Sequence, residues 1–388
     1  MNKIQLFSKI DSLKSHIASL SDQIFDHPEL GNDEIQASEW LIAEFEKAGF
    51  AIEKAPLDIP TAFIATWNHQ GGGYKIGLLC EYDALPMGHA CGHQLQGPAT
   101  LAAAISLKEN GGDTPFTLKI FGTPAEETTS AKLPMAAKGY FDDLDIALMM
   151  HGSDRTTVDD KSLALNLVNF TFLGTESHAA VAPEKGRSAL DALILLFNGI
   201  EFLREHIRSD ARIHGIIKDG GVAANIVPGK AVGQFYIRAA DRTYLDELVA
   251  RVFKVAQGAA LMTETEVKID ELKRYDNKVS VPTLNQLLLD NAKLAGAQDI
   301  TPPRASTGST DFSTVNYRVP GACIRAGFLP LGTSSHSQMW LDKGKSEEAH
   351  NAMLIAAKSL AGTVADLLAS PEVQKQLAQE FQIEKNKR

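Results

Sequence analysis

The sequence has few cysteines, no excess of basic residues and no long hydrophobic run. Its three cysteines, Cys80, Cys91 and Cys323, are too few and too scattered in 388 residues for a disulfide framework. The 38 lysines and arginines are outnumbered by 48 acidic residues, which gives a net charge of −10. This balance excludes a strong nucleic-acid binder and disfavours an anionic membrane surface as partner. No apolar run approaches the roughly 18 residues that span a bilayer, so we expect no membrane segment.

The start of the chain is not typical of a secretory signal. Its apolar residues recur every three or four positions with charges between them, which is the pattern of a helix. Together with the sparse cysteines, this predicts a cytoplasmic protein whose thiols are reduced and available as ligands. The length exceeds that of a typical single domain and predicts two.

The first part of the chain alternates predicted helices and strands. One opening helix is expected to run through Ile10 and Ile24, with its apolar residues on one face. Three apolar segments, 75–80, 117–122 and 145–150, read as strands that end directly before acidic residues or a histidine. Such alternation indicates an α/β domain with a mostly parallel sheet, in which ligands bind beyond the carboxyl ends of the strands.

The middle of the chain has a different order of elements. Residues 165–275 are predicted to form β-α-β-β-α-β, the split βαβ pattern of ferredoxin-like α+β domains. Helix-then-strand alternation returns after it. We therefore predict a discontinuous α/β domain of residues 1–164 and 276–388, with an inserted α+β domain of residues 165–275.

The segment "GHACGH" places Cys91 and His93 two residues apart between glycines. It lacks the further Cys/His pairs of a zinc finger. Three interpretations stay open from these residues alone. The segment binds a metal, or Cys91 is a nucleophile activated by a neighbouring histidine, or the segment is a structural turn.

Acidic and histidine side chains elsewhere favour a metal site. Of the adjacent pair Glu126 and Glu127, one carboxylate can bind a metal while the other accepts a proton, although a solvated acidic loop is the commoner fate of such a pair. His151 and His336 are both expected in loops after apolar or small residues. Asp83 could orient a ligand histidine through a hydrogen bond.

These motifs occur together in a familiar order. The segments are "EYDALPMGHACGH", "GTPAEE", "MMHG", "SHAAVAPEKGRSALDA", "NIVPG", "GSTDFSTVN" and "SSHSQMW". As a set covering nearly the whole chain, they resemble the aminoacylase/carboxypeptidase-G metallopeptidase family. The resemblance is to its amidohydrolase branch, and within it to aminobenzoyl-glutamate hydrolases and β-alanyl-lysine-type dipeptidases.

The resemblance implies a dinuclear metal centre in the larger domain. Its ligands would be Cys91, His93, Glu127, His151 and His336. Glu126 would be the general base and then the proton donor to the leaving amine, and Asp83 would support a ligand. Two divalent ions per subunit are implied; thiolate and imidazole ligands favour zinc, with manganese or cobalt as alternatives.

His89 and Gln94 are two further positions of the same motif. His89 matches the leading histidine of the family motif, but we do not assign it as a ligand. Gln94 stands where the family usually has an acidic residue or Asn, which changes the local charge without removing a ligand.

The resemblance also implies roles for the inserted domain, as a lid and as the surface of a homodimer. His178 would polarise the scissile carbonyl, often from the partner subunit, and Asn225 would assist it. Arg238 or Arg274 could hold a substrate carboxylate. Asn225 could instead be a turn residue and Arg238 an exposed strand residue. The motif pair Ser309 and Thr310 would line the substrate pocket or cap a helix.

The leading hypothesis is a hydrolase that cleaves the amide bond of a small N-acyl amino acid or unusual dipeptide, with water activated by metal. A catalytically inactive ligand-binding homologue and a metal-independent thiol hydrolase that uses Cys91 are the alternatives.

Overall fold

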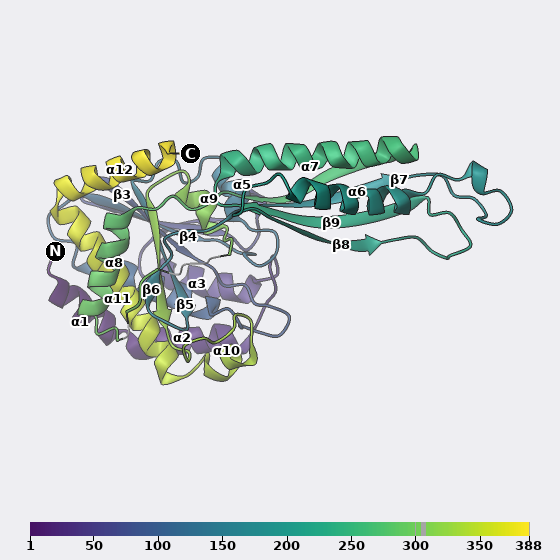
Figure 1. Cartoon of the computed structure of the whole chain (residues 1–388). Coiled ribbons are helices and arrows are strands. Elements are labelled where there is room, and N and C mark those ends of the chain that lie inside the picture. The colour runs from purple at the N-terminus through teal and green to yellow at the C-terminus, as the bar shows by residue number, and fades with distance from the viewer. Residues whose placement is uncertain (299, 304–307, 388) are drawn as a thin grey trace. The chain divides into compact units, whose positions relative to one another are not determined.

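The computed structural model describes residues 1–298, 300–303 and 308–387 (Figure 1). The chain forms two compact units. The first contains Met1–Lys161 and Lys278–Lys387, and the second contains Ser162–Asn277. Each unit has its own hydrophobic core.

The first unit is built on a seven-stranded sheet in the order β1-β2-β4-β3-β5-β11-β6. Its four central strands, β4, β3, β5 and β11, are parallel, and the outer strands β1, β2 and β6 are antiparallel to their neighbours. The predicted α/β class is therefore confirmed. The strands are β1 (Ala51–Lys54), β2 (Phe63–His69), β3 (Tyr74–Cys80), β4 (Phe116–Gly122), β5 (Ile146–Ser153), β6 (Thr157–Val158) and β11 (Gly321–Gly327).

Helices cover both faces of this sheet. They are α1 (Lys3–Ser12), α2 (Lys14–Asp26), α3 (Ile35–Lys47), α4 (Gln96–Glu109), α5 (Lys132–Ala137), α8 (Pro282–Leu294), α9 (Phe312–Asn316), α10 (Gln338–Lys343), α11 (Glu347–Ala369) and α12 (Pro371–Asn386), with short 3₁₀ helices η1 (Pro56–Asp58) and η2 (His93–Leu95). Helix α4 packs on β3 and β5, α11 packs on β5 and β11, and the two helices pack on each other, while α5 and α9 pack together on the other face.

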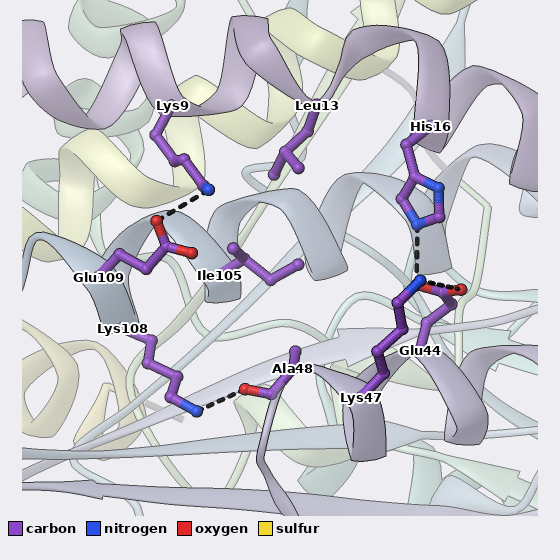
Figure 2. Close-up of a pocket in the computed structure, with 9 residues that line it drawn as sticks. All are labelled: Lys9, Leu13, His16, Glu44, Lys47, Ala48, Ile105, Lys108 and Glu109. Carbon is purple, nitrogen blue, oxygen red and sulfur yellow. Dashed lines mark hydrogen bonds and ion pairs between the residues drawn. The ribbon is translucent and has the colours of Figure 1, made fainter.

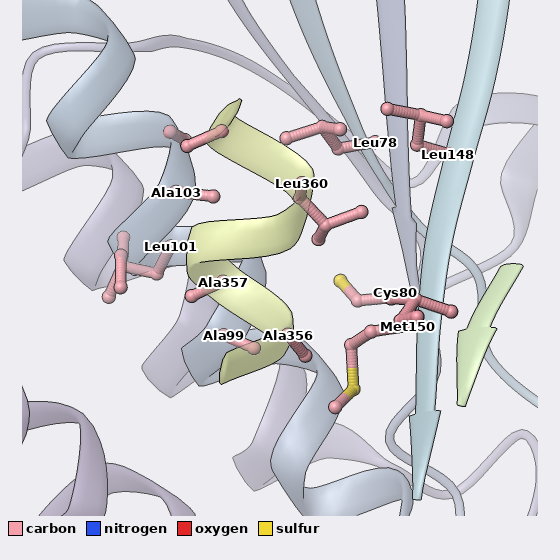
Figure 3. Close-up of a cluster of buried hydrophobic side chains, with 14 of the residues drawn as sticks. Leu78, Cys80, Ala99, Leu101, Ala103, Leu148, Met150, Ala356, Ala357 and Leu360 are labelled. Atoms are coloured by element: carbon pink, nitrogen blue, oxygen red, sulfur yellow. The ribbon is translucent and has the colours of Figure 1, made fainter. Parts of the chain in front are cut away.

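Side-chain alternation along the central strands explains this arrangement. On β3, Leu78 and Cys80 point into the core beneath α4 and α11, whereas Leu79 points into the core on the opposite face. Figure 3 shows the first of these cores, where small residues such as Ala99 and Ala356 line the facing helices. Both faces of the parallel strands are buried, which is why their sequences read as continuous apolar runs.

Two local predictions were wrong. The opening helix is broken: α1 ends at Ser12, whose hydroxyl donates to the carbonyl oxygen of Lys9 at 2.6 Å, and α2 begins at Lys14. A serine hydroxyl that bonds to the backbone competes with continuation of the helix. His151 lies within β5 rather than in a loop, because pairing with Arg325 of β11 extends the strand beyond its apolar segment.

Helix α11 also departs from expectation. It is long and apolar enough, by composition alone, to cross a membrane, although no such segment was expected. However, 78% of its most apolar stretch is buried inside the structure. This burial is the mark of a core helix that packs against the sheet.

The second unit has a four-stranded antiparallel sheet in the order β10-β7-β9-β8, covered by two helices. The predicted β-α-β-β-α-β order is confirmed. Its elements are β7 (Ala164–Leu173), the 3₁₀ helix η3 (Pro183–Lys185), α6 (Ala189–Arg204), β8 (Arg212–Asp219), β9 (Lys230–Ala239), α7 (Arg242–Thr263) and β10 (Glu266–Tyr275).

Candidate metal centre

The "GHACGH" segment lies beyond the carboxyl end of β3, where a parallel sheet places its ligands. Cys91 and His93 are both buried, and His93 begins η2. Gly92 between them has φ +83°, and a Cβ there would lie 3.0 Å from Cζ3 of Trp340. A glycine is therefore required at Gly92 for the turn that brings the thiol and the imidazole to the same side.

Asp83 connects the two loops that carry candidate ligands. Its Oδ1 lies 3.0 Å from Nδ1 of His93, and its Oδ2 accepts a hydrogen bond from the backbone N–H of Glu127 at 2.9 Å. The Asp83 contact occupies Nδ1 of His93 and leaves Nε2 as the ring nitrogen that a metal could use. Asp83 therefore contacts both loops, and its support of a metal ligand stays a prediction.

The five predicted ligands come together within the first unit. Ligand atoms of Cys91, His93 and Glu127 all lie within 4.8 Å of one another. Nε2 of His336 lies 3.3 Å from Oε1 of Glu127, and the rings of His93 and His151 are 5.4 Å apart, edge to face. Thiol, imidazole and carboxylate groups at this spacing fit transition-metal binding.

Burial sets the protonation of these groups before any cation is bound. Burial, with the charges of Arg325 and His93, lowers the pKa of His151 to about 3, so its imidazole is neutral and able to coordinate. Burial raises the pKa of the Cys91 thiol to about 11. A nucleophilic thiol needs the opposite shift, so the surroundings of Cys91 suit a ligand whose proton is released to solvent when a metal binds.

Glu126 has a different environment from its neighbour Glu127. Burial, together with the charges of Asp311, Glu81 and Glu127, raises the pKa of Glu126 well above its usual value. One oxygen each of Glu126, Glu81 and Asp311 lies within 4.8 Å of the other two. The adjacent glutamates thus belong to two different groups of side chains.

A buried lysine completes the second group, and sequence reasoning missed it. Nζ of Lys132 lies 2.6 Å from Oε1 of Glu81 and 2.9 Å from Oδ1 of Asp311, with all three side chains inaccessible to solvent. Gln96 donates to Oε2 of Glu81 at 2.8 Å, and Ser130 donates to Asp311 at 2.5 Å.

Glu81 also contacts the ligand side of the centre. Its Oε2 lies 3.2 Å from Nε2 of His93. Burial would raise the pKa of Glu81, but the charges of Lys132 and His93 outweigh it and lower the pKa to about 2. Glu81 and Asp311 lie inside the motifs "EYDALP" and "GSTDF", so the sequence offered a reason to consider them as site residues. No sequence pattern indicated Lys132.

Other candidates in the first unit lie outside these groups. His89 is buried and stacks on Phe25, with ring centroids 6.2 Å apart, and it belongs to none of the ligand groups among the described residues. Ser309 and Thr310 lead into α9, where the carbonyl oxygen of Thr310 accepts from the backbone N–H of Ser313 at 3.3 Å. Asp311, rather than either of them, is the N-cap residue of α9.

In the second unit, the structure brings together the segments of His178 and Asn225. His178 pairs with Ile226 in an antiparallel bridge, and the carbonyl oxygen of Asn225 accepts from the backbone N–H of Ala179 at 3.0 Å. Asn225 and His178 are both exposed, on the two paired segments.

The candidate arginines of the second unit are placed differently. Arg238 lies near the opposite end of β9, eight residues beyond Lys230, so roughly 26 Å of extended strand separates it from the Asn225 loop. Arg274 pairs with Asp246 at 3.0 Å. Within one copy of the second unit, neither arginine belongs to the same group of side chains as Asn225.

A surface pocket elsewhere on the first unit contains none of the candidate ligands (Figure 2). Lys9 pairs with Glu109 at 2.8 Å, and His16 pairs with Glu44 at 2.8 Å. Lys108 donates to the carbonyl oxygen of Ala48. These charged side chains already pair with one another or with the backbone. Among its described residues, the pocket therefore has no cluster of candidate metal ligands like that of the candidate metal centre.

The chain is similar to several known proteins. The model of peptidase family M20/M25/M40 matches residues 81–361. The chain is 31% identical to one of the subunits of p-aminobenzoyl-glutamate hydrolase of Escherichia coli, over 96% of this chain and 93% of that one. It is 33% identical to the Xaa-Arg dipeptidase of Mus musculus, over 96% and 90% of the two chains. A dinuclear metal-binding peptidase of the M20 family from Bacillus subtilis has the same fold, with a TM-score of 0.69, 16% identity and coverage of 92% and 99%.

Proposed function

The chain belongs to peptidase family M20/M25/M40 and is a metal-dependent hydrolase; from this premise we propose that it cleaves the amide bond of a small N-acyl amino acid or dipeptide. The observation that carries the proposal is the separation of two adjacent glutamates. Glu127 lies among the ligand atoms of Cys91 and His93, whereas Glu126 lies among buried carboxylates with a raised pKa. We therefore propose that Glu127 binds metal and that Glu126 moves a proton.

The proposed ligands are Cys91, His93, Glu127, His151 and His336, for two divalent ions per subunit. Such ions lower the pKa of water and polarise the carbonyl of a substrate amide. The mixed set of one thiol, three imidazoles and one carboxylate favours zinc, with manganese or cobalt as alternatives. The contacts of Asp83 with His93 and Glu127 fix the positions of two of these proposed ligands relative to each other.

Glu126 is the proposed general base. A buried carboxylate with a raised pKa is suited to accept a proton from the attacking water and deliver it to the leaving amine. His178 and Asn225 are proposed to stabilise the negative charge that develops on the carbonyl oxygen. Arg238, Ser309 and Thr310 remain proposed substrate contacts.

The names of the relatives suggest two kinds of substrate. One relative is named for p-aminobenzoyl-glutamate, which ends in an acidic residue, and the other for Xaa-Arg dipeptides, which end in a basic one. We propose that the substrate of this chain belongs to the same general class of amides with a free carboxylate, in the cytoplasm.

A homodimer through the second unit is also proposed. Strand β8 is the last strand in its sheet, and Ile216 and Ile217 on it are 59% and 47% exposed. Phe202 on α6 is 71% exposed. An apolar edge strand of this kind is usually covered by a partner. Because the relative from Escherichia coli is one subunit of its enzyme, a related chain is the alternative partner.

The proposal is tested by elemental analysis of metal content together with hydrolysis assays before and after chelation. The panel contains N-acetyl and N-benzoyl amino acids, p-aminobenzoyl-glutamate, Xaa-Arg dipeptides and β-alanyl dipeptides. We expect about two metals per chain, loss of activity on chelation and recovery with zinc or manganese. Glu126→Gln should keep the metals and lose nearly all turnover, whereas the matched variant Glu127→Gln should lose metal.

Three outcomes would contradict the proposal. Full activity of Glu126→Gln would remove it as the base. Activity that resists chelation and is blocked by thiol alkylation would favour the Cys91 hydrolase. Ligand binding without turnover across the panel would favour an inactive homologue.

A further inference from the structure

Glu34 is a buried carboxylate outside every motif of the candidate centre. It precedes α3, is fully inaccessible to solvent and makes no capping hydrogen bond to its own helix. Its carboxylate oxygens instead accept hydrogen bonds from two other segments of the chain. Oε1 accepts from the backbone N–H of Ala125 at 2.7 Å, and Oε2 accepts from Oγ1 of Thr61 at 3.1 Å. A buried acid used in this way holds distant backbone in place.

Ala125 directly precedes the proposed base, Glu126. Its φ of +62° lies in the left-handed region, which alanine disfavours. Its carbonyl oxygen accepts from the backbone N–H groups of Thr128 at 3.1 Å and Ser130 at 2.7 Å. A disfavoured conformation persists only where its surroundings hold it. Glu34 supplies the partner for the N–H of this residue.

The segment Glu29–Glu34 contacts the Asp83 loop as well. Ala84 donates its backbone N–H to the carbonyl oxygen of Glu29 at 2.8 Å, and Leu30 forms a parallel bridge with Ala84. A Cβ on Gly31 would lie 2.1 Å from Oγ1 of Thr128. The same short segment therefore touches the loop that holds Asp83 and the loop that carries Glu126 and Glu127.

We propose that Glu34 is a positioning residue that sets the geometry of Glu126 and Glu127 through the backbone of Ala125, with Glu29–Glu34 as the common support of both loops. The inference rests on the proposed function, since it concerns the same centre. The carboxylate of Glu34 acts on the centre through Ala125, because its hydrogen bonds go to Ala125 and Thr61 rather than to a candidate ligand.

The first test compares Glu34→Ala with wild type. Removing the carboxylate leaves the buried N–H of Ala125 without its partner and lets the turn relax. A displacement of about 1 Å at reacting groups costs on the order of 100-fold in rate. We expect kcat at saturating metal to fall by about that factor with KM within about threefold. The Kd for zinc alone, measured with a competing chromophoric chelator, should rise about tenfold, because Glu127 shifts with Glu126.

The conservative variant separates positioning from a general effect on folding. Glu34→Gln keeps an oxygen for Ala125, and its amide nitrogen can donate to Thr61. We expect it to restore kcat and zinc affinity to within about threefold of wild type. Glu39→Ala is the matched control, because Glu39 lies exposed on α3, the helix that follows Glu34, and it should match wild type.

Gly31→Ala provides a second route to the same effect without altering Glu34. Its added methyl group would lie 2.1 Å from Oγ1 of Thr128 and 3.0 Å from Cα of Ala125, so it crowds the turn at Ala125, and kcat should fall again with little change in KM. This variant keeps the test valid if Glu34→Ala does not fold.

Wild-type kcat and zinc affinity in a folded Glu34→Ala, or equal damage in Glu34→Gln, would overturn the inference. If wild type hydrolyses no amide of the panel, the proposed function fails, but zinc affinity still tests the role of Glu34.

Discussion

Nδ1 of His93 lies 3.0 Å from Oδ1 of Asp83, and neither side chain is accessible to solvent. A carboxylate behind a ligand histidine fixes the orientation of the ring and makes it a better ligand. Because Asp83 also holds the backbone of Glu127, one side chain governs two proposed ligands from different loops.

Asp83→Ala should therefore weaken metal binding without unfolding the protein. We expect the Kd for zinc to rise about 10- to 100-fold, the usual effect of losing such a support. Chelator competition measures this. Asp142→Ala, at an exposed ion pair with Arg318, is the control and should leave the Kd unchanged. An unchanged Kd in Asp83→Ala would show that His93 is oriented by other groups.

Lys132→Met should destabilise the fold strongly. The substitution leaves Glu81 and Asp311 buried without their cation, and breaking a buried pair from one side costs about 3–5 kcal/mol in the free energy of unfolding. The comparison is Lys119→Met, which breaks a partly exposed pair with Asp143 and should cost at most about 1 kcal/mol. Urea unfolding of metal-free protein measures both. Equal losses would mean that the Lys132 cluster relaxes or admits water.

Glu34 should make stability depend on pH. Burial raises the pKa of Glu34 to about 7, aided by the charge of Asp83 and opposed by hydrogen bonds from Ala125 and Thr61. An acid with a raised pKa in the folded state binds more protons folded than unfolded, so its contribution to stability falls as pH rises from about 4.5 to about 7. The full loss is about 3 kcal/mol.

Glu34→Gln cannot ionise and should lack this loss. Urea unfolding of metal-free wild type and Glu34→Gln at pH 5 and pH 8 gives the difference directly. The free energy of unfolding of the variant minus that of wild type should be larger at pH 8 than at pH 5. Parallel pH profiles would contradict the raised pKa of Glu34.

Much of the architecture could be predicted because hydrophobic periodicity is a local property. The β-α-β-β-α-β unit follows from apolar alternation in its strands and helical spacing between them. Predictions failed where neighbours in space decide. His151 is in a strand because β11 pairs with it, and the end of an apolar run could not show that pairing.

By itself, the sequence determined the residue types and spacing of the candidate ligands, and their motifs identified the family. Tertiary structure alone decided which other groups surround them. Lys132 meets Glu81 across 51 residues and Asp311 across 179, and Glu34 meets Ala125 across 91. Such contacts produce no periodic pattern in the sequence, because a single buried charge needs only one partner. The fold alone brings the two residues within contact distance.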